Sequence, residues 1–268
     1  MRSALSALAL CAAVLAPLDA QLLPPDANGL TLGHVHLNVT DVDAQKKFWT
    51  TFFDAKPLTN EKAQLPGVKV PGLLILFTKK EPARGSEGCT MDHFGFRVRS
   101  LKEMMDSLSA AGYEVGKPFK GTEGFQNAYV TGPDKVRIEM QEDVNLPVKA
   151  AVNHLHFMLK DAMVLRSWYI EKLGLTATTR GSLQTANASG GNLSFSPART
   201  EPVGSKGTSI DHIGFEVTNL EAYCRKLEAE GIKFDVPYRK VPALGVAIAF
   251  ITDPDDVSIE LTEGLTAF

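Results

Sequence analysis

Three short motifs each occur twice in this chain, and their repetition constrains the fold more than any other feature. The first is His-x-His on an alternating run, the second is Asp-His-x-Gly-Phe-x-Val, and the third is Pro-Asp-x-Val-x-Ile-Glu. The paired segments are residues 32–41 with 152–161, 92–98 with 211–217, and 132–140 with 253–261. All three recur after about 120 residues, and this constant register indicates a tandem duplication.

The duplication predicts two domains, at residues 30–143 and 150–264, with the boundary near residues 145–149. Each half is itself double, because an alternating strand followed by an amphipathic helix occurs twice within it. The expected helices span residues 43–53, 101–111, 162–173 and 220–230. A glycine follows three of these helices, as is typical of helix C-termini. We therefore expect an α+β fold of four units, each a strand, a helix and about three further strands.

Alternation along the expected strands places the ionisable residues on one face of each sheet. In the first strand Val35, Leu37 and Val39 form the apolar side, so the histidines between them face the other way. The helices must cover the apolar face, which leaves the polar face for a site. By the same rule the polar faces carry His34, His36, His93 and Glu139 in the first half, and His154, His156, His212 and Glu260 in the second.

The segment before the repeat has the pattern of a secretory signal peptide. Met1 and Arg2 form a short positive region, residues 4–15 are uncharged and apolar, and Ala20 precedes a suitable cleavage position. The run is short for a membrane span, although an uncleaved anchor or a buried helix fits the same pattern. We expect residues 1–20 to be removed, leaving a secreted or periplasmic protein that is not held at a membrane.

The charge of the chain limits the classes of partner that it is expected to bind. The formal net charge of −3 offers no basis for binding nucleic acid or an anionic membrane surface, so a small molecule is the expected partner.

Cys89 and Cys224 remain after cleavage and lie at unrelated places in the repeat, which favours two separate thiols over a disulfide.

The motifs taken together resemble the vicinal-oxygen-chelate superfamily, which includes glyoxalase I, extradiol dioxygenases, fosfomycin-resistance proteins and bleomycin-binding proteins. The resemblance covers residues 30–264 and rests on the His-containing strands, the aromatic helices and the Pro-Asp-x-Val-x-Ile-Glu endings. It implies four βαβββ units that pair into two curled mixed-sheet domains, with helices outside and a metal inside each.

The resemblance also implies the ligands, which come from the first strand of each unit and the last strand of a unit. It assigns His34, His93 and Glu139 to the first domain, and His154, His212 and Glu260 to the second. Such a set, with open positions for a chelating substrate, suits one Fe, Mn, Zn or Ni ion per domain. The fourth ligand of glyoxalase I has no good counterpart, since the matching strands offer Ile75 and Phe77, or Ser194 and Ser196.

Extradiol dioxygenases also use a His and a Tyr near the ligand Glu. Here Tyr129 precedes Glu139, whereas Phe250 occupies the corresponding place before Glu260, with Lys240 nearby. His36 and His156 fit three roles: alternative ligands, groups that exchange protons with substrate, or simple hydrogen-bonding residues. We take His36, His156 and Tyr129 as the candidate catalytic residues.

The function expected from the sequence is that of an exported, divalent-metal-dependent enzyme acting on a small oxygenated metabolite. The resemblance leaves open a lyase or isomerase of glyoxalase type and a dioxygenase. The alternative is a non-catalytic protein of the same fold that binds or sequesters a small molecule.

Overall fold

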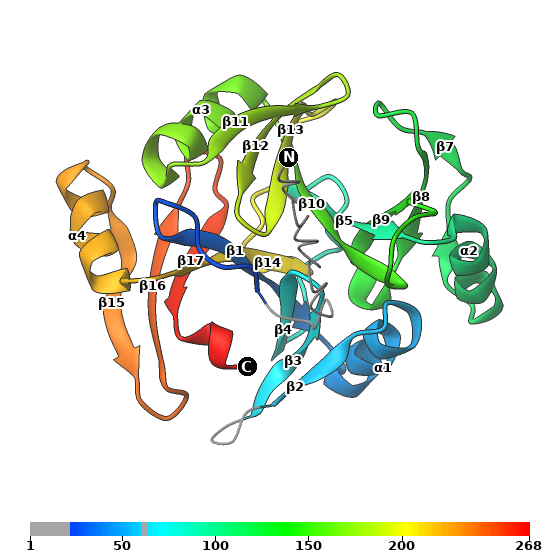
Figure 1. Cartoon of the computed structure of the whole chain (residues 1–268), viewed down its shortest axis with the longest axis horizontal. Coiled ribbons are helices and arrows are strands. Elements are labelled where there is room, and N and C mark those ends of the chain that lie inside the picture. The colour runs from blue at the N-terminus through cyan, green and yellow to red at the C-terminus, as the bar shows by residue number, and fades with distance from the viewer. Residues whose placement is uncertain (1–21, 60–63) are drawn as a thin grey trace, which may run out of the picture.

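The computed structural model describes residues 22–59 and 64–268, and it has a mixed α+β architecture of two sheets with helices at the periphery (Figure 1). The predicted signal peptide, residues 1–20, lies outside the described residues. Four α-helices are described: α1 (Val42–Phe52), α2 (Leu101–Ala110), α3 (Ala162–Leu173) and α4 (Leu220–Ala229). These bounds confirm the expected helices to within about a residue, the usual ambiguity of a helix end.

Each helix begins at a side chain that caps its first turn. Asp41 accepts hydrogen bonds from the backbone N–H groups of Asp43 and Ala44, and Asp161 does the same at α3. Such a cap satisfies N–H groups that have no partner within the helix. At the other end of α3, Gly174 adopts φ 77°, a left-handed conformation that glycine enters without strain.

The strands form two mixed sheets. In the first sheet the order is β15 (Phe234–Val241), β16 (Val246–Thr252), β17 (Ser258–Glu263), β14 (Ile210–Val217), β1 (Leu30–Val39), β4 (Leu73–Lys79), β3 (Gln64–Val70) and β2 (Lys56–Thr59). In the second the order is β11 (Thr176–Arg180), β12 (Leu183–Ala188), β13 (Gly191–Pro197), β10 (Ala150–Leu159), β5 (Met91–Val98), β9 (Arg137–Glu142), β8 (Gln126–Thr131) and β6 (Glu114–Val115), with β7 (Phe119–Lys120) beside β8.

The order of the strands shows that each sheet is assembled from both halves of the chain. Within a unit the first and last strands are parallel neighbours, as β1 is to β4 and β14 is to β17. Between units, β1 pairs antiparallel with β14, and β5 pairs antiparallel with β10. The first unit thus shares a sheet with the fourth, and the second with the third. Segments 30–143 and 150–264 describe the sequence repeat, but neither sheet is confined to one of them.

The units of one half meet instead through the apolar side of their sheets. In the first half, Trp49 of α1 stacks on Phe94 of β5 with ring centroids 5.6 Å apart, and Phe53 lies 4.8 Å from Phe96. In the second half, the Tyr169 hydroxyl donates a 2.9 Å hydrogen bond to Asp253. Hydrogen-bonded sheets therefore connect the halves, while buried aromatic packing joins the units of the first half and a buried hydrogen bond joins those of the second.

Cys89 and Cys224 are buried free thiols, as expected for unpaired cysteines. Among the helices in residues 22–59 and 64–268, none has both the length and the apolar character needed to cross a bilayer.

Candidate metal centres

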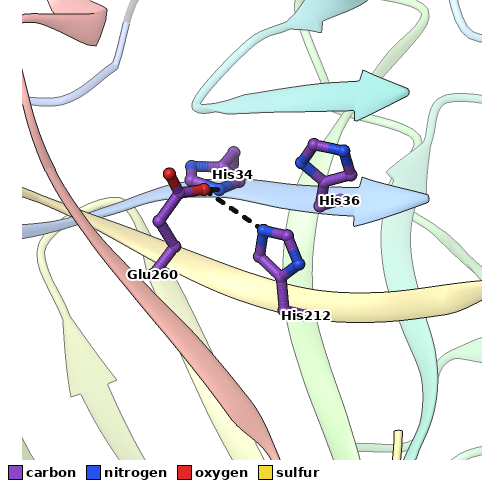
Figure 2. Close-up of side chains that lie close together, drawn as sticks. All are labelled: His34, His36, His212 and Glu260. Atoms are coloured by element: carbon purple, nitrogen blue, oxygen red, sulfur yellow. Dashed lines mark hydrogen bonds and ion pairs between the residues drawn. The ribbon is translucent and has the colours of Figure 1, made fainter. Parts of the chain in front are cut away.

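The first cluster, which we call the His34 site, lies where β1, β14 and β17 run side by side (Figure 2). It contains His34 and His36 from β1, His212 from β14 and Glu260 from β17. The Oε2 atom of Glu260 lies 2.9 Å from Nε2 of His34 and 3.1 Å from Nε2 of His212. His36 stacks on His212 with ring centroids 4.4 Å apart. One carboxylate oxygen therefore sits between two imidazoles that come from opposite halves of the chain.

The second cluster, the His93 site, repeats this geometry in the other sheet. It contains His93 from β5, Glu139 from β9, and His154 and His156 from β10. The Oε2 atom of Glu139 lies 2.9 Å from Nε2 of His93 and 3.3 Å from Nε2 of His154. His93 and His156 have ring centroids 4.6 Å apart.

These contacts correct the expected grouping of the ligands. The family resemblance implied His34, His93 and Glu139 as one set, and His154, His212 and Glu260 as the other. In the structure His34 joins the pair from the fourth unit, and His154 joins the pair from the second. The reason is the strand pairing, because β1 lies against β14 and not against β5.

Two glycines make room for the histidines that cross between halves. His34 lies opposite Gly214 in the β1–β14 register, and His154 lies opposite Gly95 in the β10–β5 register. A Cβ atom at either glycine would overlap the facing imidazole ring. The glycine of the Asp-His-x-Gly motif is therefore required by the close approach of the imidazole ring to the backbone.

The aspartate of the same motif orients the next residue, a role that strand alternation does not reveal. Asp211 Oδ1 lies 2.7 Å from Nδ1 of His212, and Asp92 Oδ1 lies 2.6 Å from Nδ1 of His93. Such a contact fixes the orientation of the ring, with Nδ1 toward the aspartate and Nε2 toward the glutamate. A carboxylate behind a ligating histidine is a common arrangement around protein-bound metals. In the sequence, the aspartate directly before the histidine of this motif is the signal that could have indicated this role.

The electrostatics keep both glutamates anionic and lower the pKa of three of the six imidazoles, those of His36, His154 and His156. Burial of Glu139 and Glu260 would raise the pKa of each carboxyl, but hydrogen bonds from the adjacent histidines outweigh it and hold each pKa well below its usual range. Burial lowers the pKa of His36 to about 3 and that of His154 to about 4. Burial also opposes the charge on His212, but contacts with Asp211 and Glu260 raise its pKa.

These donors fit a divalent metal ion. The candidate ligand atoms of each cluster all lie within 4.8 Å of one another. Nδ1 of His154, although buried, has no hydrogen-bond partner among the described residues, and its Nε2 has only the 3.3 Å contact with Glu139, which lacks the geometry of a hydrogen bond. A buried nitrogen lone pair costs free energy unless something occupies it, and coordination is one such occupant. Two imidazoles and a carboxylate, with positions left open, form a set suited to Fe(II), Mn(II), Zn(II) or Ni(II).

The candidate catalytic histidines lie beside these sets and are held by hydroxyl groups. Nε2 of His36 lies 2.7 Å from the Thr78 hydroxyl, and Nε2 of His156 lies 2.8 Å from the Ser196 hydroxyl. Each histidine is close enough to its cluster to serve as a further ligand. The two rings are thus positioned to contact either a metal or a molecule bound to it.

The strand that could supply a fourth ligand carries different residues beside the two sites. In register, His36 lies beside Leu76 and His156 lies beside Ser194. Ile75 and Phe77, which the sequence offered at this place, are buried on the apolar side instead. Leu76 has no donor atom, so the strand supplies no fourth ligand beside His36.

Tyr129 and Phe250 occupy matching places, as the sequence predicted. Tyr129 pairs with Glu139 across β8 and β9, and Phe250 pairs with Glu260 across β16 and β17. The Tyr129 hydroxyl lies 3.5 Å from Oε2 of Glu139, and burial raises its pKa, so it remains protonated. Lys240, which the sequence placed near Phe250, lines a separate cavity together with Tyr238. In the β15–β16 register, Arg239 is the residue that pairs with Ile248.

Comparison with known families gives a match over both repeats. The model of the Glyoxalase/Bleomycin resistance protein/Dioxygenase superfamily matches residues 31–140 and 151–261. These two segments together cover most of the chain, and they coincide with the two halves of the sequence repeat.

Individual relatives cover nearly the whole chain. A lactoylglutathione lyase of Schizosaccharomyces pombe is 22% identical over 89% of this chain and 98% of its own length. Glyoxalase I from Zea mays superposes with a TM-score of 0.70 at 16% identity, covering 89% of this chain and 94% of the maize chain. A candidate dioxygenase from Bacillus subtilis superposes with a TM-score of 0.64 at 12% identity, covering 87% and 84%. At these identities the structural likeness concerns the fold.

Metal stoichiometry tests the composition of the two sites. We expect up to about two divalent ions per chain, with Glu139→Ala and Glu260→Ala each removing about one, because alanine cannot replace a charged ligand. Combining His34→Ala with Glu260→Ala should still leave about one ion, since both changes fall in one site. Combining His34→Ala with Glu139→Ala should leave none. Elemental analysis after reconstitution and desalting measures the content.

Glu221→Ala, which removes an exposed carboxylate paired with Arg225 on α4, is the matched control and should keep the full content. If His34→Ala with Glu139→Ala retained an ion while His34→Ala with Glu260→Ala lost both, the grouping by sequence halves would be right after all.

Proposed function

Since the chain belongs to the Glyoxalase/Bleomycin resistance protein/Dioxygenase superfamily, we propose that it is an exported, divalent-metal-dependent enzyme acting on a small oxygenated metabolite. The observation that carries the proposal is the pair of buried clusters, each with two imidazoles facing one carboxylate. A metal held there would polarise a chelating substrate oxygen and stabilise the negative charge that develops on it.

The protein's own groups would bind and orient that substrate. His34, His212 and Glu260 would hold the metal, and Asp211 fixes the ring of His212. His36, neutral and anchored on Thr78, would face the open side and hydrogen-bond to a substrate oxygen. In the other site His156 would take this place, and the protonated Tyr129 hydroxyl would offer a second donor beside Glu139.

We favour lyase or isomerase chemistry over oxygenation for the His34 site. An oxygenase of the extradiol type needs groups that move protons to and from the substrate, and Phe250 supplies none. The His93 site has Tyr129 at the corresponding place, so it is the better oxygenase candidate.

The substrate we propose is not a glutathione conjugate, although one relative is a lactoylglutathione lyase. Export would separate the enzyme from a cosubstrate that is mainly intracellular. The His34 site also lacks a donor at Leu76, where a fourth protein ligand would lie.

A non-catalytic binding protein of the same fold is the second candidate. The observation that favours it is the low pKa of His36, which makes its imidazole a weak base at neutral pH. Metal-dependent ligand binding without turnover of any member of a panel of hydroxycarbonyl compounds would select this function.

Export is tested at the N-terminus. Because residues 1–20 have the pattern of a cleavable signal, we expect the mature protein to begin near Gln21. N-terminal sequencing of protein from the native host gives the answer, and soluble cytoplasmic protein with Met1 intact would end this part of the proposal.

The choice of chemistry is tested by oxygen uptake. With Fe(II) and catechol-like substrates we expect no oxygen consumption, or consumption confined to the His93 site and abolished by His93→Ala. An oxygen electrode together with analysis of ring-cleavage products measures this. Rapid uptake by the Glu139→Ala variant, which keeps only the His34 site, would show that Phe250 does not prevent oxygenation.

A further inference from the structure

The two sites have the same types of candidate ligand, but the side chains around these ligands differ. Strand register identifies matching positions, because each residue is paired with an equivalent ligand strand. Leu74 and Leu76 of the His34 site correspond to Asn192 and Ser194 of the His93 site. The remaining pairs, with the His34-site residue first, are Ile248 and Asn127, Phe250 and Tyr129, and Thr262 and Gln141. At four of the five positions an apolar side chain replaces a polar one.

The apolar residues of the His34 site line a cavity that opens onto the metal-binding cluster. The cavity has a volume of about 290 Å³, and His36 and Glu260 form part of its wall. Most of its wall is apolar and includes Leu65, Leu76, Val246, Ile248 and Leu265, while Arg239 and Thr262 add polar groups. These five apolar residues belong to a hydrophobic cluster separate from the main core, so they are not needed to bury the helices. The volume is at the lower end of the range for small-molecule sites.

The C-terminal turn closes one side of this cavity, and a buried carboxylate holds it there. Oε1 of Glu216 accepts hydrogen bonds from the backbone N–H groups of Gly264 at 2.6 Å and Leu265 at 3.0 Å. Burial raises the pKa of Glu216, and its other oxygen accepts from the Thr262 hydroxyl. In the second sheet Arg97 occupies the position that matches Glu216. Its side chain is exposed, and its Nη1 atom lies 3.8 Å from Oδ2 of Asp143. The apolar wall is thus specific to the His34 site.

The cavity of the His93 site is smaller and more polar, although Phe119 and Leu183 also line it. It has a volume of about 210 Å³, and its wall includes Asn127, Gln141, Glu123 and Arg180. Arg180 donates to Glu123 and to the Ser194 hydroxyl, each at 3.1 Å, and Gln141 donates to Glu123 at 3.0 Å. An alkyl chain placed here would separate these groups from water without replacing their hydrogen bonds, which is unfavourable.

We propose that the His34 site binds chelating ligands that carry an apolar chain, whereas the His93 site selects small polar chelators. The inference rests on the proposed function, because the chelating end of the ligand needs the metal at each cluster. The apolar end would fill the cavity beside Leu76 and Ile248. Each buried methylene strengthens binding by about fourfold, so a chain of several carbons separates the two sites clearly.

Alkyl hydroxamates are suitable probes, since they chelate a metal through two adjacent oxygens and can be made with any chain length. The full-length Glu139→Ala variant provides the His34 site alone, and Glu260→Ala provides the His93 site alone. Each is loaded with Co(II) and titrated with acetohydroxamate and octanohydroxamate, with the visible spectrum of the metal and calorimetry as readouts. At the His34 site we expect octanohydroxamate to bind at least about tenfold more tightly than acetohydroxamate. At the His93 site we expect no gain, or weaker binding.

Exchanging the wall residues should exchange the preference. Leu76→Ser and Ile248→Asn copy the other site and should each reduce the octanohydroxamate advantage several-fold, with little change for acetohydroxamate. Val164→Ser removes an apolar side chain from the exposed surface of α3 and should change neither affinity. Using two wall variants keeps the test valid if one of them does not fold.

The outcomes separate the inference from the proposed function. If acetohydroxamate binds both sites and octanohydroxamate shows no preference for the His34 site, the chain-binding inference is wrong while the metal centres stand. If neither hydroxamate perturbs the Co(II) spectrum because no metal is bound, the proposed function itself fails.

Discussion

The antiparallel pairing of β1 with β14, and of β5 with β10, is the interaction on which the rest of the structure depends. Each pair joins a first strand from one half of the chain to a first strand from the other. It brings His34 to Glu260, and His154 to Glu139, so that each carboxylate meets a histidine from the other half of the chain. It also sets Gly214 and Gly95 beneath the two imidazoles. Without this register neither carboxylate would meet a second histidine.

Duplication explains why there are two sites, and strand pairing explains why each belongs to both halves. Each site combines residues from both copies of the repeat. The residues that flank its ligands can therefore differ from those at the other site. The ligand set constrains the residues at the centre, while the neighbouring strands need only keep the sheet together. Leu76 and Ser194 show the result, since one sheet position carries a buried leucine and its counterpart a hydrogen-bonded serine. Two centres of one type can thereby serve different ligands within one chain.

Much of the fold was accessible from the sequence, because periodicity and motif spacing report local structure and the facing of side chains. The helices, the mixed α+β class and the shared face of the histidines and glutamates followed from these signals. The partner of each unit did not follow, because all four first strands carry similar motifs and alternation says nothing about which strand lies alongside. Ile75 and Phe77 illustrate a second limit, since a shift of one residue along a strand reverses the face.

The walls of the sites were the least predictable part. Leu65, Ile248 and Leu265 belong to no motif, and Leu265 reaches its place through the hydrogen bonds that Glu216 makes to the C-terminal turn. Such contacts arise only when distant segments pack, and no spacing rule in the sequence signals them.

The claim that both centres are assembled from opposite halves is tested most directly by locating the metals. Crystals grown with Co(II) and measured at the cobalt absorption edge give anomalous peaks at each bound ion. We expect one peak ligated by His34, His212 and Glu260, and another ligated by His93, His154 and Glu139. A peak held by His34 together with His93 and Glu139, or peaks remote from both clusters, would contradict this claim.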